Sequence, residues 1–204
     1  MITLQFLLTA LVVVIAPGTG VIYTLAIGLG RGRAAAIWAA AGCTLGIVPH
    51  IAAAMLGLAA ILHTSALLFA VVKWAGVAYL LYLAWTMLRT ADGMTVNADA
   101  SASSGLRTAW RGALINILNP KLSIFFLALL PPFLSGQAST ATTEMMQLGA
   151  VFMALTFVVF VAYGHFAALA RRRVLGAPGV MRWFNRGFAA VFAALAGRLA
   201  LERA

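Results

Sequence analysis

The sequence predicts an all-α integral membrane protein, with six transmembrane helices arranged as two inverted repeats of three helices. Of its 204 residues, 64% are apolar and only 9% are charged, whereas a soluble domain is about half apolar and a quarter charged. Several uncharged runs of roughly 20 residues, the length that crosses a bilayer, follow one another. Basic residues gather in alternate connections between these runs, a pattern typical of polytopic membrane proteins. The chain therefore has room for one membrane domain, residues 1–204, and for no sizeable soluble one.

Six spanning segments can be placed, with ends defined to within a few residues. The apolar stretch TLQFLLTALVVVIA is expected to be retained as part of the first helix, because no basic region precedes it and no small-residue cleavage site follows it. The last segment contains two arginines, so a partly interfacial position stays open for it. The predicted segments cover residues 3–28, 34–61, 66–89, 109–135, 145–170 and 181–202.

The connections between these segments predict the orientation of the chain. Connections one, three and five hold ten of the fourteen basic residues, whereas the second has no Lys or Arg and the fourth offers only Glu144. Because cytoplasmic loops collect Lys and Arg, the odd connections are expected to face the cytoplasm and both termini the outer side. This distribution accounts for the net charge of +10 without a nucleic-acid partner, which basic proteins otherwise bind through its phosphates.

A polar linker without aromatic residues, 90–107, separates the helices into two groups of three, residues 3–89 and 108–202. Because three is an odd number, the second group must cross the membrane in the opposite sense, so homology between the groups would make an inverted repeat. Pro17 and Pro120 lie near the middle of the first helix of each group, and a glycine follows each proline by 29 residues. These correspondences favour the inverted repeat.

The fourth predicted helix carries a lysine near its centre. Lys121 lies about 15 Å along the helix axis from either end, so its ammonium group does not easily reach the interface. A central lysine costs on the order of 3 kcal/mol to insert, and it normally faces a bundle interior or a wet cavity. Lys121 is therefore predicted to bind a substrate carboxylate. The alternative is that it pairs with carbonyl groups freed by Pro120 and stabilises the fold.

Two asparagines accompany this lysine. Pro120 lacks an N–H group and clashes with the carbonyl of Asn116, so the helix is expected to kink or open there. Asn116 and Asn119 are three residues apart and share a helix face, where their amides can bind the loosened backbone or a ligand. The plainer interpretation is a proline kink with polar repair, which is common in membrane helices.

A matching break is predicted in the first helix, at the sequence APGTG. Pro17 frees the carbonyl of Val13, and Gly18 allows backbone conformations closed to other residues. A helix that stops and restarts here would direct unpaired N–H groups toward the membrane centre, where they can bind an anion. Thr19 adds a hydroxyl group. Two broken helices at corresponding places in two halves indicate the binding site of a transporter.

The second predicted helix contains GCTLGIVPH. Gly42 and Gly46 form a GxxxG pair, which allows close helix packing in a membrane. His50 follows a proline near the middle of the helix, and an imidazole there could bind substrate or carry a proton near neutral pH. A histidine that merely bonds to a neighbouring helix is the equally weighted alternative.

Several kinds of chemistry are absent from the sequence. No Asp or Glu lies inside a predicted span, so a carboxylate proton relay or an acidic cation site is excluded. No P-loop or other nucleotide motif occurs, which argues against a primary pump. The three histidines and one cysteine are scattered and make no metal site. Neither an enzyme nor a cofactor is therefore predicted.

Three stretches resemble the LysE/RhtB amino-acid exporters. They are GLGRGRAAAIWAAAG after the APG of the first helix, KWAGVAYLLYLAWTMLR, and NPKLSIFFLALLPPF, which is similar to the NPK-x4-F region of the family. The resemblance places the proline and glycine of the family on Pro17 and Gly18, and its NPK on Asn119, Pro120 and Lys121. Most members read PGPN where this chain has PGTG, which removes the usual asparagine of the first helix.

The resemblance implies a six-helix exporter of amino acids or their derivatives in the bacterial inner membrane, driven by proton motive force and compatible with a homodimer. Basic-amino-acid exporters carry an acid near the position of His50, so the resemblance implies a neutral, homoserine- or threonine-like substrate here. The substrate-binding residues predicted from both lines of reasoning are Pro17, Gly18, Thr19, His50, Asn116, Asn119, Pro120 and Lys121. The alternative is a membrane protein that does not transport but assembles with other proteins or organises lipid, its polar residues serving as interhelical contacts.

Overall fold

The computed structural model describes residues 2–62 and 104–174, together with scattered helical positions between residues 74 and 88 and between 186 and 201. Every element within these residues is helical, which confirms the all-α prediction for this part of the chain. Most of the third and sixth predicted spans and most of the predicted linker lie outside the described residues. The elements are α1 (Leu4–Ile15), α2 (Thr19–Arg31), α3 (Arg33–Leu45), α4 (Val48–Leu62), α6 (Gly105–Ile117), α7 (Pro120–Ile124), the π-helical turn η1 (Phe125–Leu129), the 3-10 turn η2 (Pro131–Phe133) and α8 (Ala138–Val174).

The first predicted span is two helices, α1 and α2, with a bend of 56° between them. Thr3 starts α1 by accepting a hydrogen bond from the Phe6 N–H at 3.1 Å. Ala16 ends it in an extended conformation, as expected for the residue before a proline. α2 stops at Gly32, whose φ of +84° favours glycine. The predicted break at Pro17 is therefore present.

The fourth predicted span divides in the same way, with 55° between α6 and the segment Lys121–Leu129. Ser104 caps the start of α6, accepting from the Arg107 N–H at 3.3 Å. After α6 ends, the side chain of Asn119 accepts from the Lys121 N–H at 3.1 Å and so caps α7. Pro120 takes the first position of α7, where its missing N–H has no helical role.

The second predicted span also contains a break, which the sequence interpretation did not place. α3 ends before Gly46, and α4 begins at Val48, one residue before Pro49. The two helices remain close enough to collinear to form a single apolar span, Arg33–Gly57. The fifth predicted span, 145–170, corresponds to α8, which is longer at both ends.

Contacts between helices define their relative directions. Trp38 meets Gly105, Gly42 meets Ala109, and Gly46 meets Ala113. Because the residue numbers of both helices increase together from one contact to the next, α3 and α6 run parallel.

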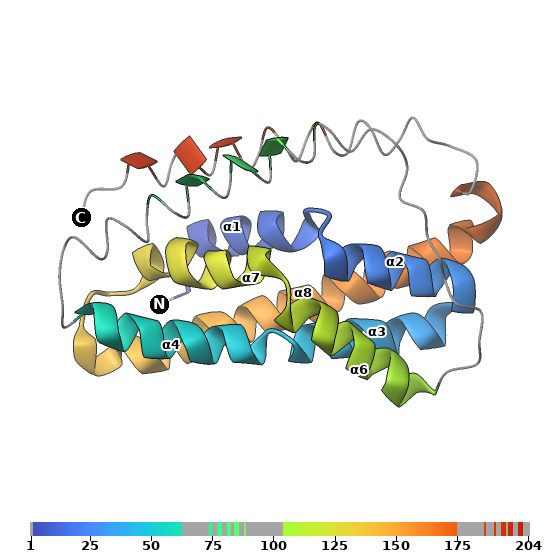
Figure 1. Ribbon diagram of the computed structural model, residues 1–204, viewed down its shortest axis with the longest axis horizontal. Coiled ribbons are helices and arrows are strands. Elements are labelled where there is room, and N and C mark those ends of the chain that lie inside the picture. Colours follow the sequence, from blue (N-terminus) through green and yellow to red (C-terminus); the bar gives the residue numbers. More distant parts are fainter. Residues whose placement is uncertain are drawn as a thin grey trace.

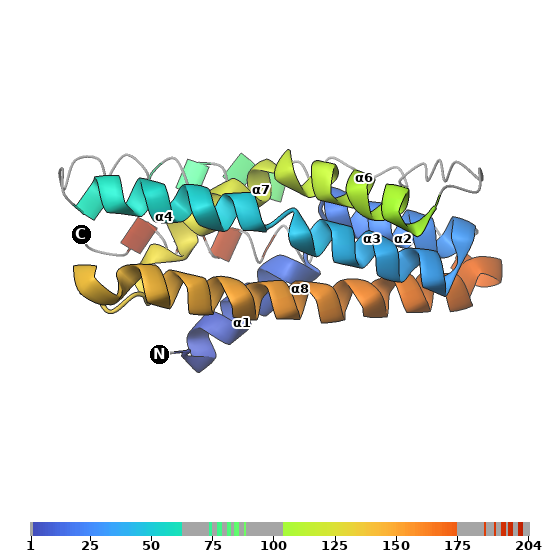
Figure 2. The same ribbon diagram turned by 90° about the horizontal axis from the view of Figure 1, so that it is seen from below.

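α8 runs the opposite way to α3 and α4, since Gly164 packs on Ala36 and Gly149 on Ile51. Figures 1 and 2 show α8 along the length of the bundle, with α3 and α4 following one another beside it.

Two of the described helical segments, Arg33–Gly57 and Ser139–Ala170, are long and apolar enough to cross a membrane, and four spans result if each bent pair counts as one.

The bundle interior holds a cluster of aromatic rings. Phe125 stacks on Phe152 with 4.5 Å between ring centroids, and Phe126 meets Phe152 edge to face at 5.2 Å. This cluster lies beside the two breaks, at the base of the candidate site.

Candidate functional site

The break between α1 and α2 leaves polar backbone groups inside the bundle. Pro17 has no N–H to give to the carbonyl of Val13, and Ala16 precedes the break with its own carbonyl outside any helical bond. On the other side, the first helical bond of α2 runs from the Ile22 N–H to the Gly18 carbonyl at 2.9 Å. The N–H groups of the preceding residues, Thr19 to Val21, have no partner within α2. Acceptors and donors therefore face one another across this break.

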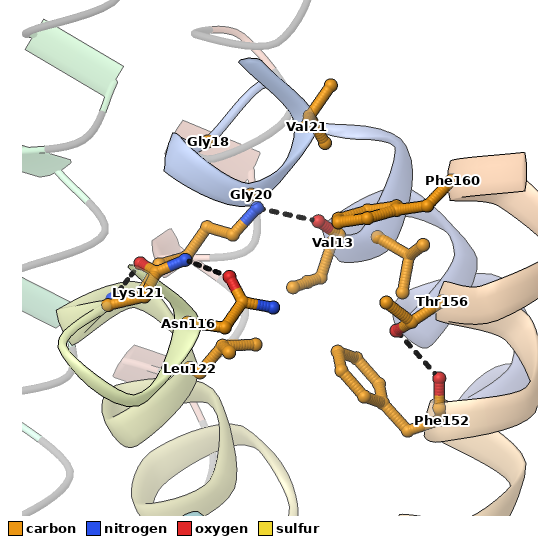
Figure 3. Close-up of a pocket in the computed structure, with 12 residues that line it drawn as sticks. Val13, Gly18, Gly20, Val21, Asn116, Lys121, Leu122, Phe152, Thr156 and Phe160 are labelled. Carbon is orange, nitrogen blue, oxygen red and sulfur yellow. Dashed lines mark hydrogen bonds between the residues drawn. The ribbon is translucent and has the colours of Figure 1, made fainter. Parts of the chain in front are cut away.

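Lys121 fills the break from the opposite side of the bundle. Its Nζ donates to the carbonyl of Val13 at 3.1 Å (Figure 3) and to that of Ala16 at 3.0 Å. A Cβ atom on Gly18 would lie 3.0 Å from this Nζ, so glycine leaves the ammonium group the room it occupies. The side chain of Lys121 is only 9% exposed. Its partners are thus the carbonyls freed at Pro17, and not those freed at Pro120 as one interpretation of the sequence expected.

The break between α6 and α7 is closed by side chains. The carbonyl of Asn116, which faces Pro120 four residues ahead, accepts from the Asn119 N–H at 3.0 Å and contacts Nε2 of His50 at 2.8 Å. The Asn116 amide donates from Nδ2 to the carbonyl of Cys43 at 2.7 Å and accepts at Oδ1 from Asn119 at 3.4 Å. Asn116 therefore binds α3, α4 and the start of α7 at once, and it is 2% exposed.

A partly open pocket lies between the two breaks, with about 280 Å³ of space between protein atoms when its open side is included. Lys121 and Asn116 reach it from one side, and the start of α2 borders it on another (Figure 3). Asn119 is also among its lining residues. No carboxylate lines it, and Lys121 is the one charged side chain among its lining residues. The lining residues are Val13, Val14, Gly18, Gly20, Val21, Asn116, Asn119, Lys121, Leu122, Phe152, Thr156 and Phe160.

The third wall of this pocket comes from α8 and was not predicted. Phe152, Thr156 and Phe160 lie four residues apart, so they share one face of the helix. Thr156 is buried and donates its hydroxyl proton to the Phe152 carbonyl at 2.8 Å, which leaves the hydroxyl oxygen able to accept a bond. A single threonine flanked by phenylalanines at helical spacing was the available signal in the sequence.

The structure brings together half of the predicted site residues. Gly18, Asn116, Asn119 and Lys121 all line the pocket, and Pro120 begins the short helix that carries Lys121.

The other three predicted residues do not line the pocket. Pro17 shapes the break without bordering the cavity, and Thr19 has an exposed side chain. His50 is buried behind Asn116, which it contacts through the backbone.

Gly20, at the start of α2, must be glycine because of its neighbours from α6 and α8. A Cβ atom there would lie 2.5 Å from Oδ1 of Asn116 and 3.0 Å from the ring of Phe160. The amide of Asn116 thus occupies the space that a side chain on α2 would otherwise take. Gly20 has no side chain, and Asn116 of α6 provides the polar group at this point.

The arrangement suits a small anion better than a cation. A buried ammonium group and the start of α2, whose first N–H groups have no partner within the helix, border one cavity, and both favour negative charge. Two carbonyl oxygens hold the ammonium group. They are neutral acceptors, so a carboxylate would bind the lysine more strongly than they do.

Comparison with known proteins gives one family. The model described as LysE type translocator matches residues 11–203. A homoserine/homoserine lactone efflux protein of Salmonella typhimurium is 30% identical over 97% of this chain and 95% of its own length. An uncharacterized membrane protein of Vibrio cholerae is 30% identical over 98% of this chain and 97% of its own length.

A leucine efflux protein of an Enterobacter strain is 27% identical over 76% of each chain. No solved structure matches the chain. These findings confirm the family resemblance predicted from the sequence.

Proposed function

Because the chain belongs to the LysE type translocator family, we propose that it exports an amino acid or an amino-acid derivative across the bacterial inner membrane, driven by proton motive force. The observation that carries this proposal is the position of Lys121. It joins two broken helices at a cavity that no acidic side chain lines. Family membership weighs against the alternative of a membrane protein that only organises partners or lipid.

The substrate carboxylate is proposed to replace two backbone carbonyls on Lys121. One carboxylate oxygen would take the place of the Val13 and Ala16 carbonyls on Lys121, and the other would accept from the N–H groups of Thr19 and Gly20 at the start of α2. The released carbonyls can then accept from the substrate ammonium group. One substrate thus satisfies the acceptors and donors that the break at Pro17 leaves open.

The rest of the substrate is proposed to lie toward the amides and α8. Asn116 and Asn119 offer polar contacts, whereas Phe152 and Phe160 offer apolar ones. A basic side chain on the substrate is disfavoured, because no carboxylate among the lining residues could pair with it. An acidic side chain is disfavoured too, because Lys121 already binds the substrate's own carboxylate. The chemistry of the lining residues therefore favours a small neutral amino acid, in agreement with the names of the homoserine and leucine efflux relatives.

The proposed topology has six spans in two inverted repeats, residues 3–89 and 108–202, joined by the linker 90–107 in one membrane domain. The similar bends of 56° and 55° in the first and fourth spans support this symmetry. The parallel course of α3 and α6, both of which begin beside arginines, supports cytoplasmic odd loops and outer termini. Alternating access would come from movement of one repeat against the other. A homodimer in the lipid stays a prediction.

Counterflow in proteoliposomes tests the proposal. Vesicles loaded with one unlabelled amino acid and diluted into its labelled form are expected to accumulate label transiently when they contain the protein. The panel should include homoserine, threonine and leucine, with lysine and glutamate as charged comparisons. Absence of counterflow for every member, with protein that remains monodisperse, would sink the proposed function.

Replacing Gly20 by alanine is expected to impair transport, with little loss of folded protein. The new methyl group would displace the Asn116 amide from the pocket, and losing its hydrogen bond with the substrate costs about 0.5–1.5 kcal/mol. That loss corresponds to a rise of roughly 2- to 13-fold in the counterflow KM. Thr19→Ala is the matched control, because that side chain is exposed and only its backbone N–H is used. Equal KM values for the two variants would contradict the role given to Asn116.

A further inference from the structure

The imidazole of His50 has a defined tautomer. Nε2 lies 2.8 Å from the carbonyl oxygen of Asn116, and Nδ1 lies 3.0 Å from the hydroxyl of Ser123. A carbonyl can only accept, so Nε2 carries a proton and donates it. In the neutral ring Nδ1 is then an acceptor, and Ser123 donates to it. The ring is 7% exposed and both of its nitrogens are bonded within the protein.

We propose that Nδ1 of His50 binds the proton that is exchanged for the substrate, an inference that rests on the proposed export. Protonation would place a second N–H on the ring, directed at Ser123. The hydroxyl of Ser123 can rotate and accept this bond, because a hydroxyl is both donor and acceptor. Both protonation states therefore keep two hydrogen bonds, and the proton needs no rearrangement of the backbone to bind.

The bond from Nε2 connects this proton to the substrate pocket. Its acceptor is the backbone carbonyl of Asn116, whose side chain lines the pocket and abuts Gly20. A hydrogen bond from a charged donor is shorter and stronger than one from a neutral donor. A proton on Nδ1 therefore tightens the hold of α4 on the break between α6 and α7. The protonated and the neutral transporter can in this way differ in their ability to change orientation.

Other titratable groups on the elements packed against α4 are engaged elsewhere. α7 carries Lys121, which is bound to two carbonyls, and η1 has no titratable side chain. On α8, Glu144 is bonded to Ser135 and Thr140 at an exposed end, Tyr163 donates to the Ile15 carbonyl, and the ring of His165 meets Phe166. 

The flanking helices add Cys43 on α3, beside Asn116, and arginines at the starts of α3 and α6. Among all these side chains imidazole is the type that gains and loses a proton near neutral pH, and His50 is the histidine bonded to a pocket residue.

The exchange cycle predicts a specific defect. In an exchanger, the loaded transporter changes orientation with substrate, and the empty transporter must return with its proton. Counterflow uses only the loaded steps, whereas accumulation driven by a pH gradient also uses the empty return. Loss of the proton site should therefore abolish gradient-driven accumulation while most of the counterflow remains.

His50→Gln is the first test, in inverted proteoliposomes with labelled leucine or whichever panel member gives wild-type counterflow. The glutamine amide can still donate to the Asn116 carbonyl, but it does not take up a proton. We expect counterflow to persist. Accumulation of the labelled amino acid against its concentration gradient should be lost, so that its concentrations inside and outside the vesicles only become equal. Substrate-linked proton movement, followed with a trapped pH dye, should disappear as well. Gradient-driven accumulation equal to wild type would overturn the proposal.

Ser123→Ala provides the second test, which keeps the imidazole. Without the hydroxyl, the charged ring loses a stronger bond than the neutral ring does. The pH profile of gradient-driven transport should therefore move to lower pH, while counterflow at fixed pH stays near wild type. An unmoved profile in this variant, or joint loss of counterflow and accumulation in folded His50→Gln, would show that His50 is only structural. Wild-type protein without counterflow would instead refute the proposed function.

Discussion

Replacing Lys121 by glutamine is expected to lower the affinity for substrate by about 10- to 150-fold, the factor that corresponds to losing a charged hydrogen bond of about 1.5–3 kcal/mol. The glutamine amide is one bond shorter but still donates to the carbonyls of the first break. It therefore retains much of the structural role of Lys121 and none of its charge. The counterflow KM for homoserine measures the effect.

The lactone of homoserine provides a matched ligand for this variant. It has no free carboxylate, so wild-type protein should bind it more weakly than homoserine, and the preference should disappear in Lys121→Gln. Lys121→Met, which has neither charge nor donor, should in addition lower the thermal stability, because the carbonyls of Val13 and Ala16 lose a buried partner. If Lys121→Gln transported homoserine like wild type, Lys121 would serve the fold and not the ligand.

Replacing Gly42 by alanine is expected to destabilise the bundle more than any other single methyl group discussed above. The added Cβ would collide with the backbone carbonyl of Ala109, and a backbone atom cannot rotate away as a side chain can. α3 and α6 must then separate along their shared length. Over-packing of this kind costs about 1–3 kcal/mol, and each kcal/mol lowers the unfolding midpoint by about 2–4 °C in chains of this size.

Gly57→Ala is the matched control for that experiment. Gly57 belongs to the same apolar span, Arg33–Gly57, and among the described residues a Cβ there would meet only Leu127, at an ordinary contact distance of 3.4 Å. Thermal unfolding in detergent, followed by circular dichroism or by a thiol-reactive dye on Cys43, should separate the two variants. Equal midpoints would mean that the close crossing of α3 and α6 contributes little to stability.

The positions of the helix breaks could be predicted because proline acts locally. Pro17 and Pro120 each lack the backbone N–H donor and clash with the carbonyl four residues earlier in a helix. The chain bends at both prolines. The break between α3 and α4 had a comparable local signal in Gly46 and Pro49. Interpreting Gly46 as part of a GxxxG pair instead predicts close packing and no break. The ends of α8 differ from the prediction because hydropathy marks only the apolar part of a helix, the part that crosses the bilayer. The helix itself continues into polar residues at both ends.

The partners of the site residues could not be predicted from the sequence. Depth and periodicity place Lys121 inside the bundle, but they do not say which neighbouring helix it meets. Its bonds to Val13 and Ala16 depend on how the first and fourth spans cross. The same holds for His50: its sequence context left open whether it serves the substrate or bonds to a neighbouring helix, and its ring bonds to the backbone of Asn116. Long-range packing decides both outcomes.

The glycine contacts near the arginine-bearing ends of the helices affect permeability as well as stability. Gly28 meets Gly164, and Gly42 meets Ala109, backbone against backbone. Close to the same level, the Tyr23 hydroxyl donates to the Thr108 carbonyl at 2.8 Å. These helix pairs leave no space between them for a file of water molecules, along which protons and small ions could leak. A path between these helices would therefore open only when the backbones themselves move apart.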